Sequence, residues 1–198
     1  MVCAHELSPK QGSECAVGWH IATRLARHHD VTVICAAGSQ HQPASYRRAV
    51  EEHLRAHGSI QHLDFVFVEQ PAGARRLAAL NRLISGGHGV GFRPLFYAAL
   101  KLWHRAAYEK ALELGPDRFD VVHHVTPIAF WGSGELWRLG RPYVWGPISG
   151  VGGFSLPFAR GISLRESCSL TPRVAKCGSA SGLAGSDSTA SPSPRSAR

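Results

Sequence analysis

The sequence lacks a long apolar stretch and a hydrophobic leader. No run approaches the ~20 apolar residues of a membrane-spanning helix, and no signal peptide precedes the first patterned segment. These absences argue against a protein held in a membrane by long apolar helices. We therefore expect a cytoplasmic protein, with peripheral contact at the inner face of a membrane as an alternative.

Cysteines are few and show no pairing pattern. The five cysteines include no CxxC pair and no spacing typical of a zinc finger. Their odd number favours a reducing compartment over a disulfide framework. Cys35 ends an apolar run, which is typical of a small buried hydrophobic residue. We expect no metal site.

The sequence also lacks a concentrated basic region. Its net charge is +8 and its isoelectric point is near 9.7, values that favour a nucleic-acid partner when the charge is clustered. No basic run is longer than Arg47-Arg48 or Arg75-Arg76. Such a dispersed field suits a phosphorylated small molecule or an anionic membrane surface equally well. We expect no nucleic-acid partner.

Apolar, β-branched runs alternate with amphipathic segments along most of the chain. This alternation predicts a parallel sheet with helices on both faces and right-handed crossovers, an α/β, Rossmann-like fold. Strands are expected over residues 1–5, 30–37, 63–71, 119–127 and 142–147, and helices over residues 17–29, 43–58, 74–87, 92–115 and 133–140.

The pattern is lost near the end of the chain. Residues 163–198 contain no aromatic side chain and are rich in Ser, Pro, Gly and Ala, so they bury too little surface to offset their ordering entropy. A flexible linker and translation out of frame both explain this composition, and the abrupt change favours the second. We expect a Rossmann-like domain over residues 1–160 and a disordered or out-of-frame tail over residues 161–198.

The segment SPKQGSECAVGW, residues 8–19, follows the first expected strand and leads into the first helix. Ligands of open parallel sheets bind beyond the carboxyl ends of the strands, where this segment lies. Gly12 and Gly18 would let backbone approach a ligand, and the N–H groups of the helix start would bind an anion. The G-x-G-x-x-G motif of dinucleotide folds and the GK[ST] motif of P-loops are both absent. A plain turn with a helix cap, with Glu14 in the first helical turn, remains the alternative.

Three motifs together resemble a known enzyme family. HELSPKQGSECAVGW, FDVVHHVTP and LWRLGRPYVWGPISGVGG are similar to the amino-terminal domain of GT-B-fold glycosyltransferases, family 4, also called group 1 transferases. The resemblance covers residues 1–158. It implies that the chain derives from an enzyme that transfers a sugar from a nucleotide sugar to a glycan or lipid acceptor.

The resemblance also implies roles for named residues. Gly12, Ser13 and Glu14 would form the loop that closes on the donor diphosphate, with Gly12 nearest to it. Gly146, Gly150 and Gly152 would line the acceptor side of the cleft between two domains. No DxD motif stands in the cleft-facing loops, so the resemblance implies a transferase without a metal or other cofactor, in which dipoles and cations stabilise the leaving diphosphate.

His123 and His124 are the catalytic candidates. Family members often carry H-x-H in this strand, with the second histidine near the acceptor hydroxyl, whereas Val125 stands at that position here. Successive side chains of a strand point to opposite faces, so one histidine faces the cleft and the other is buried. A core or cap role is the alternative for either residue. Trp19 is expected to pack its helix on the sheet.

The carboxy-terminal, donor-binding domain of that family has no counterpart in the sequence, nor has its E-x(7)-E signature. We therefore expect an inactive fragment of a hexosyltransferase-type enzyme. One alternative is a two-chain transferase in which a partner chain completes the cleft. A non-catalytic binding module and a nucleotide-dependent oxidoreductase also remain open, although the missing glycine fingerprint disfavours the latter.

Overall fold

Five parallel strands form a single sheet, as the alternating pattern predicts. A computed structural model of the chain describes residues 1–40, 42, 44–86, 90–129 and 132–149, so Gly150, Gly152 and the expected tail over residues 161–198 lie outside the described residues. The strand order is β3-β2-β1-β4-β5. The strands are β1 (Val2–Ala4), β2 (Val31–Ala36), β3 (Leu63–Val68), β4 (Val122–Thr126) and β5 (Tyr143–Trp145).

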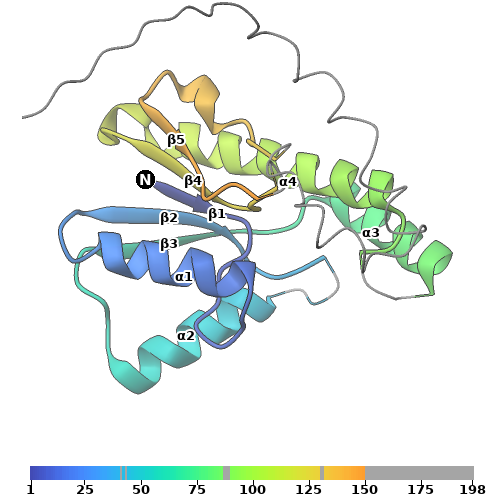
Figure 1. Ribbon diagram of the computed structural model, residues 1–198, viewed down its shortest axis with the longest axis horizontal. Coiled ribbons are helices and arrows are strands. Elements are labelled where there is room, and N and C mark those ends of the chain that lie inside the picture. Colours follow the sequence, from blue (N-terminus) through green and yellow to red (C-terminus); the bar gives the residue numbers. More distant parts are fainter. Residues whose placement is uncertain (41, 43, 87–89, 130–131, 150–198) are drawn as a thin grey trace, which may run out of the picture. The chain divides into compact units, whose positions relative to one another are not determined.

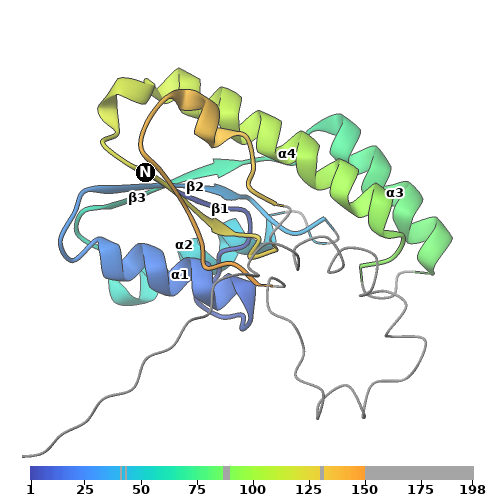
Figure 2. The same cartoon turned by 45° about the horizontal axis from the view of Figure 1, so that its top comes forward.

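Helices cover both faces of the sheet. Figure 2 shows α1 and α2 on one face and α4 on the other, with α3 packed beside α4. The helices are α1 (Glu14–Leu25), α2 (Ser45–His57), α3 (Ala72–Ser85) and α4 (Arg93–Leu114), and the short 3-10 turns are η1 (Pro116–Arg118) and η2 (Leu136–Leu139). The α/β, Rossmann-like fold is therefore confirmed.

Most elements lie where the sequence predicts them. The helix expected over residues 17–29 begins earlier, at Glu14, because Ser13 ends the preceding loop as its N-cap residue. The helix expected over residues 133–140 is only the 3-10 turn η2. Only five residues lie between Gly134 and Gly140, which both have a positive φ, and these are too few for a longer helix.

The core divides into two layers, one on each face of the sheet. Val2 and Ala4 of β1 pack toward α1, whereas Cys3 between them packs with Trp103 of α4, as the two-residue period of a strand requires. The Trp103 indole is fully buried, and its Nε1 donates a hydrogen bond to the carbonyl of Val68, 3.2 Å away. This bond ties α4 to β3.

Trp19 is part of the core, as expected. Its ring lies parallel to that of Phe65 in β3, with ring centres 5.9 Å apart, and the residue is buried in the layer beneath α1. The tryptophan therefore fastens α1 to the sheet.

The order of the strands fixes where a ligand site is expected. From β1 the chain moves outward to β2 and β3, then crosses back over the α4 face to β4 on the other side of β1 (Figure 1). The connections after β1 and β4 therefore leave the sheet toward opposite faces. The gap between their carboxyl ends is the topological switch point, where open α/β sheets bind ligands.

Candidate functional site at the carboxyl edge of the sheet

A cavity of about 270 Å³ lies at this switch point. His5 and Glu6 after β1 line it, together with Ser13 and Glu14 at the start of α1 and Pro127 after β4. The first turns of α4 contribute Arg93, Phe96, Tyr97 and Leu100. The cavity thus combines carboxylates, an imidazole and aromatic rings in one place.

Hydrogen bonds hold the backbone of Glu6 from β4. The N–H of Glu6 donates to the hydroxyl of Thr126 over 3.0 Å, and the same hydroxyl donates to the carbonyl of Glu6, also over 3.0 Å. Thr126 is fully buried at the end of β4. The point at which the chain leaves β1 is therefore fixed against β4.

Gly18 of α1 packs against the backbone carbonyl of Glu6. A Cβ atom at Gly18 would lie 2.4 Å from the carbonyl oxygen of Glu6 and 3.3 Å from the Cβ of Ala4. Only a glycine lets α1 pack this closely on the chain after β1. Gly18 is buried within α1, so its role here is helix packing, which differs from the ligand approach considered from the sequence.

The two glutamates at the cavity share an environment that disfavours their charge. Burial, together with the neighbouring Glu14, raises the pKa of Glu6 to about 7, although a hydrogen bond from the Cys15 thiol acts against the shift. Burial also raises the pKa of Glu14, although the Ile128 N–H, 3.4 Å from its Oε2, opposes the change. A carboxyl group that titrates near neutral pH can accept or release a proton there.

The imidazole of His5 is neutral and held in place. Burial lowers its pKa to about 3, and nearby His124 adds to the effect. Its ring lies edge-on to Trp103, with ring centres 4.7 Å apart, and the side-chain amide of Gln70 contacts its Nε2 at 3.3 Å. His5 therefore forms a fixed, uncharged part of the cavity lining.

The predicted diphosphate loop lies partly at this cavity. Ser13 and Glu14 line it, whereas Gly12 is exposed and a Cβ added to it would meet nothing within 4 Å. Ser13 has a φ of 56°, a backbone conformation that residues other than glycine rarely adopt. It makes no side-chain cap. The segment therefore presents backbone N–H groups at the start of α1, and its role in binding an anion stays a prediction.

The two strand histidines lie elsewhere. His123 pairs with Val2 and faces α1, where its Nε2 contacts the carbonyl oxygen of Gly146 at 2.9 Å. His124 pairs with Cys3 on the α4 face and is fully buried beside His104, with ring centres 5.3 Å apart. The two side chains do point to opposite faces, but neither lines the cavity at the switch point.

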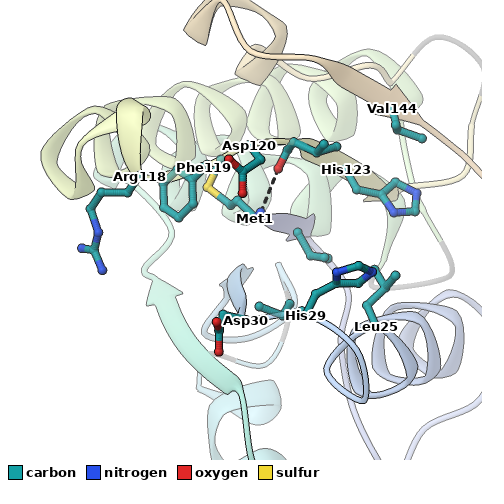
Figure 3. A pocket seen from close by; sticks show the side chains of 12 residues that line it. Met1, Leu25, His29, Asp30, Arg118, Phe119, Asp120, His123 and Val144 are labelled. Carbon is teal, nitrogen blue, oxygen red and sulfur yellow. Dashed lines mark hydrogen bonds between the residues drawn. The ribbon is translucent and has the colours of Figure 1, made fainter.

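Another cavity, of about 350 Å³, lies at the opposite edge of the sheet. Figure 3 shows Met1 and Asp120 on one side of it and His29 and Asp30 on the other. His123 also lines this cavity. It lies at the amino ends of the strands, so we place the candidate site at the switch point instead.

Sequence reasoning missed His5, Glu6 and Arg93 as site residues. The signal for the first two was available, because they directly follow β1, the central strand of the sheet. Arg93 and the neighbouring Phe96 reach the site because α4 starts above the carboxyl edge, which no local pattern encodes. Within the described residues, no cluster of three His, Cys, Asp or Glu side chains is suited to a metal ion, and none of the helices is long and apolar enough to cross a bilayer.

No protein-family model, curated protein or solved structure matches this chain. We therefore infer the function from the motifs, the fold and the geometry of the cavity.

Proposed function

We propose that this domain is the acceptor-side half of a glycosyltransferase that uses a nucleotide-sugar donor. The observation that carries the proposal is the cavity at the β1–β4 switch point, which the start of α1, Glu6 and Glu14 line. The motif resemblance to family 4 glycosyltransferases supports the same assignment.

In this proposal the donor diphosphate binds at the start of α1. Backbone N–H groups at a helix N-terminus, aided by the helix dipole, favour an anion, and exposed Gly12 leaves room for one. Among the described residues that line the cavity, Arg93 is the one basic side chain apart from the neutral imidazole of His5. A leaving diphosphate needs more positive charge than this. We therefore assign the rest of the donor site to a second domain, in the same polypeptide or in a partner chain.

A non-catalytic binding module is the second candidate, because the cavity would bind a ligand without the second domain. An oxidoreductase is less well supported, since the glycine fingerprint for a dinucleotide is absent after β1.

Titration with nucleoside diphosphates tests the proposal on the chain itself. Binding of UDP, GDP or ADP is measured by amide NMR for the natural sequence, for Gly12→Val and for Ser59→Val, a control in an exposed loop before β3. A branched side chain at Gly12 blocks the approach of phosphate to backbone, so the affinity should fall about tenfold in Gly12→Val and stay unchanged in the control. Equal affinity of all three proteins, or no binding by any, would reject the diphosphate role of this loop.

A further inference from the structure

Two histidines lie about one helical turn apart on α2. His53 and His57 are four positions apart in the helix, a spacing that puts both side chains on the same face. Their imidazole rings are stacked, with ring centres 4.3 Å apart and planes inclined by 21°. Two neutral imidazoles at this spacing can bind one metal ion through their ring nitrogens.

A hydrogen bond sets the tautomer of His57. Its Nδ1 lies 3.0 Å from the carbonyl oxygen of His53, and a carbonyl oxygen only accepts hydrogen bonds. Nδ1 therefore carries the proton, and in the neutral ring Nε2 keeps its lone pair. Metal-binding histidines almost always donate from their second ring nitrogen to a carbonyl, a carboxylate or water. The bond therefore leaves Nε2 of His57 available to a cation.

The ring of His53 is held in place by Trp19. It lies edge-on to the buried indole, with ring centres 4.9 Å apart and planes at 76°. His53 is half-buried, whereas His57 is exposed in the last turn of α2, so an ion can reach the pair from solvent. Because both histidines stand on one helix, little conformational freedom is lost when an ion joins them.

The charges around the pair permit a cation. His57 is the last residue of α2, and the carbonyl groups at this end form the negative pole of the helix dipole. Lys10, which acts electrostatically on His53, is paired with Glu52 over 2.5 Å, so its repulsion is partly offset. Arg55 lies two positions from each histidine and therefore on the opposite side of the helix.

We propose that His53 and His57 form a two-histidine site for a divalent transition-metal ion, with water in the other coordination positions. Imidazole suits Zn²⁺, Ni²⁺ and Cu²⁺, and Cu²⁺ should bind most tightly of the three. The described residues hold no cluster of three possible ligands, so the ion keeps positions open for water or for an atom of a bound molecule. The site is independent of the proposed function, and it differs from the expectation, drawn from the sequence, of no metal site.

The histidine pair lies away from the candidate cavity. α2 begins after the carboxyl end of β2 and ends before β3 starts, so its last turn lies at the amino edge of the sheet (Figure 1). Neither histidine lines the cavity at the carboxyl edge. A metal ion on the pair would therefore brace the last turn of α2 without contacting a ligand in that cavity.

NMR titrations of the full chain with Zn²⁺ test the proposal, at a pH about one unit above the ordinary histidine pKa of about 6.5. They compare the natural sequence, His57→Ala and His20→Ala, a control at an exposed position of α1. Zn²⁺ should shift the imidazole resonances of His53 and His57. His57→Ala should weaken binding about tenfold or more, because a single imidazole cannot chelate the ion. His20→Ala should leave the affinity unchanged.

A second variant separates chelation from two independent weak sites. His53→Ala should lose as much affinity as His57→Ala, and the double variant should bind about as weakly as either single variant, since the two ligands act as one unit. Urea unfolding without metal checks the fold. His57→Ala removes an exposed side chain and should unfold at the same urea concentration as the natural protein.

Two further readouts locate the ion. Cu²⁺ is paramagnetic and broadens nearby resonances, so the indole N–H signal of Trp19 should disappear before that of Trp103, which packs on the other face of the sheet. At a free Zn²⁺ concentration about ten times the dissociation constant, amide protons in the last turn of α2 should exchange about tenfold more slowly.

Three outcomes would overturn the proposal: no binding of Zn²⁺ or Cu²⁺ at about 1 mM metal, resonance shifts centred on other histidines, or equal affinity in His57→Ala and the natural protein. Each of these outcomes leaves the proposed function standing, because the pair lies outside the cavity.

Discussion

At the scale of single residues, the contact between Gly18 and the carbonyl of Glu6 links the first helix to the candidate site. The sequence marks Gly18 only as a small residue inside a helical pattern, where glycine is unfavourable by about 1 kcal/mol relative to alanine. The 2.4 Å approach that a Cβ would make depends on where α1 lies on the sheet. A local pattern does not contain that information, which is why the role of Gly18 was not predicted.

Gly18→Ala should lower the free energy of unfolding by about 1–3 kcal/mol, because α1 must move away from β1 to make room for a methyl group. Gly12→Ala is the matched control, since a Cβ there meets nothing within 4 Å, and its effect should stay within about 0.5 kcal/mol. Urea unfolding of both variants measures the difference. Equal stability of the two would mean that α1 does not pack on Glu6 as described.

His124 gives the stability a dependence on pH. Burial lowers its pKa from 6.5 to about 4, although the nearby backbone of Gly132 acts in the opposite direction. The unfolded chain therefore takes up this proton first as the pH falls. Stability should be lost between pH 6.5 and about 4, at up to about 1.4 kcal/mol per pH unit from this group.

His124→Leu should make this loss shallower, while the buried His5 and His104, whose pKa values are also lowered, keep part of it. Urea unfolding at several pH values measures the slope. The same slope in the variant and the natural protein would show that His124 is not buried in its neutral form.

At the scale of elements, the sequence predicts the sheet well and the helix contacts poorly. Strands such as β2 carry enough β-branched residues between clear breaks to be recognised locally. The order β3-β2-β1 follows from short right-handed connections, whereas β4 pairs with β1 after a connection that contains both α3 and α4. The packing of α3 against α4 has no such local signal. It depends on Asn81, a fully buried side chain of α3 whose Nδ2 donates to the carbonyl of Val90 over 2.9 Å and whose Oδ1 accepts from the N–H of Phe92 over 2.6 Å.

Asn81→Ala should destabilise the domain by about 1–3 kcal/mol, because two backbone groups near the start of α4 lose their buried partner. Arg82→Ala, at the exposed neighbouring position, should have an effect within about 0.5 kcal/mol. Hydrogen exchange at Phe92 should also become faster in Asn81→Ala alone. Unchanged exchange there would mean that Asn81 does not hold the start of α4.

At the scale of the whole molecule, the carboxyl edge after the first strand is the part of the site that the sequence could predict, because open parallel sheets bind ligands there. The α4 wall of the cavity and the position of Glu6 were not predictable, since they depend on how distant elements approach. For His123 and His124, the local geometry was predictable but the position of the cavity was not. Their alternation across the strand was predicted correctly from the two-residue period, yet the cavity lies beyond the strand end.

The isolated chain should transfer no sugar from any nucleotide sugar. Aligning the acceptor hydroxyl with the anomeric carbon of the donor contributes roughly 7–11 kcal/mol to such a reaction, and we assign most of the donor site to a second domain. Purified protein with radiolabelled UDP-, GDP- and ADP-sugars and membrane extract as acceptor provides the assay. Transfer above a heat-killed control would mean that this chain alone, or with a co-purified partner, completes the cleft.

The most direct measurement is an amide NMR map of where a nucleoside diphosphate and methyl glucoside bind along the chain. Binding at the carboxyl edge predicts that the nucleotide perturbs the backbone from Gly12 to Cys15 and that the glycoside perturbs Glu6 and Phe96. Perturbations centred instead on the amino edge, at Met1, His29 and Asp120, would contradict the account, as would the absence of any perturbation by either molecule.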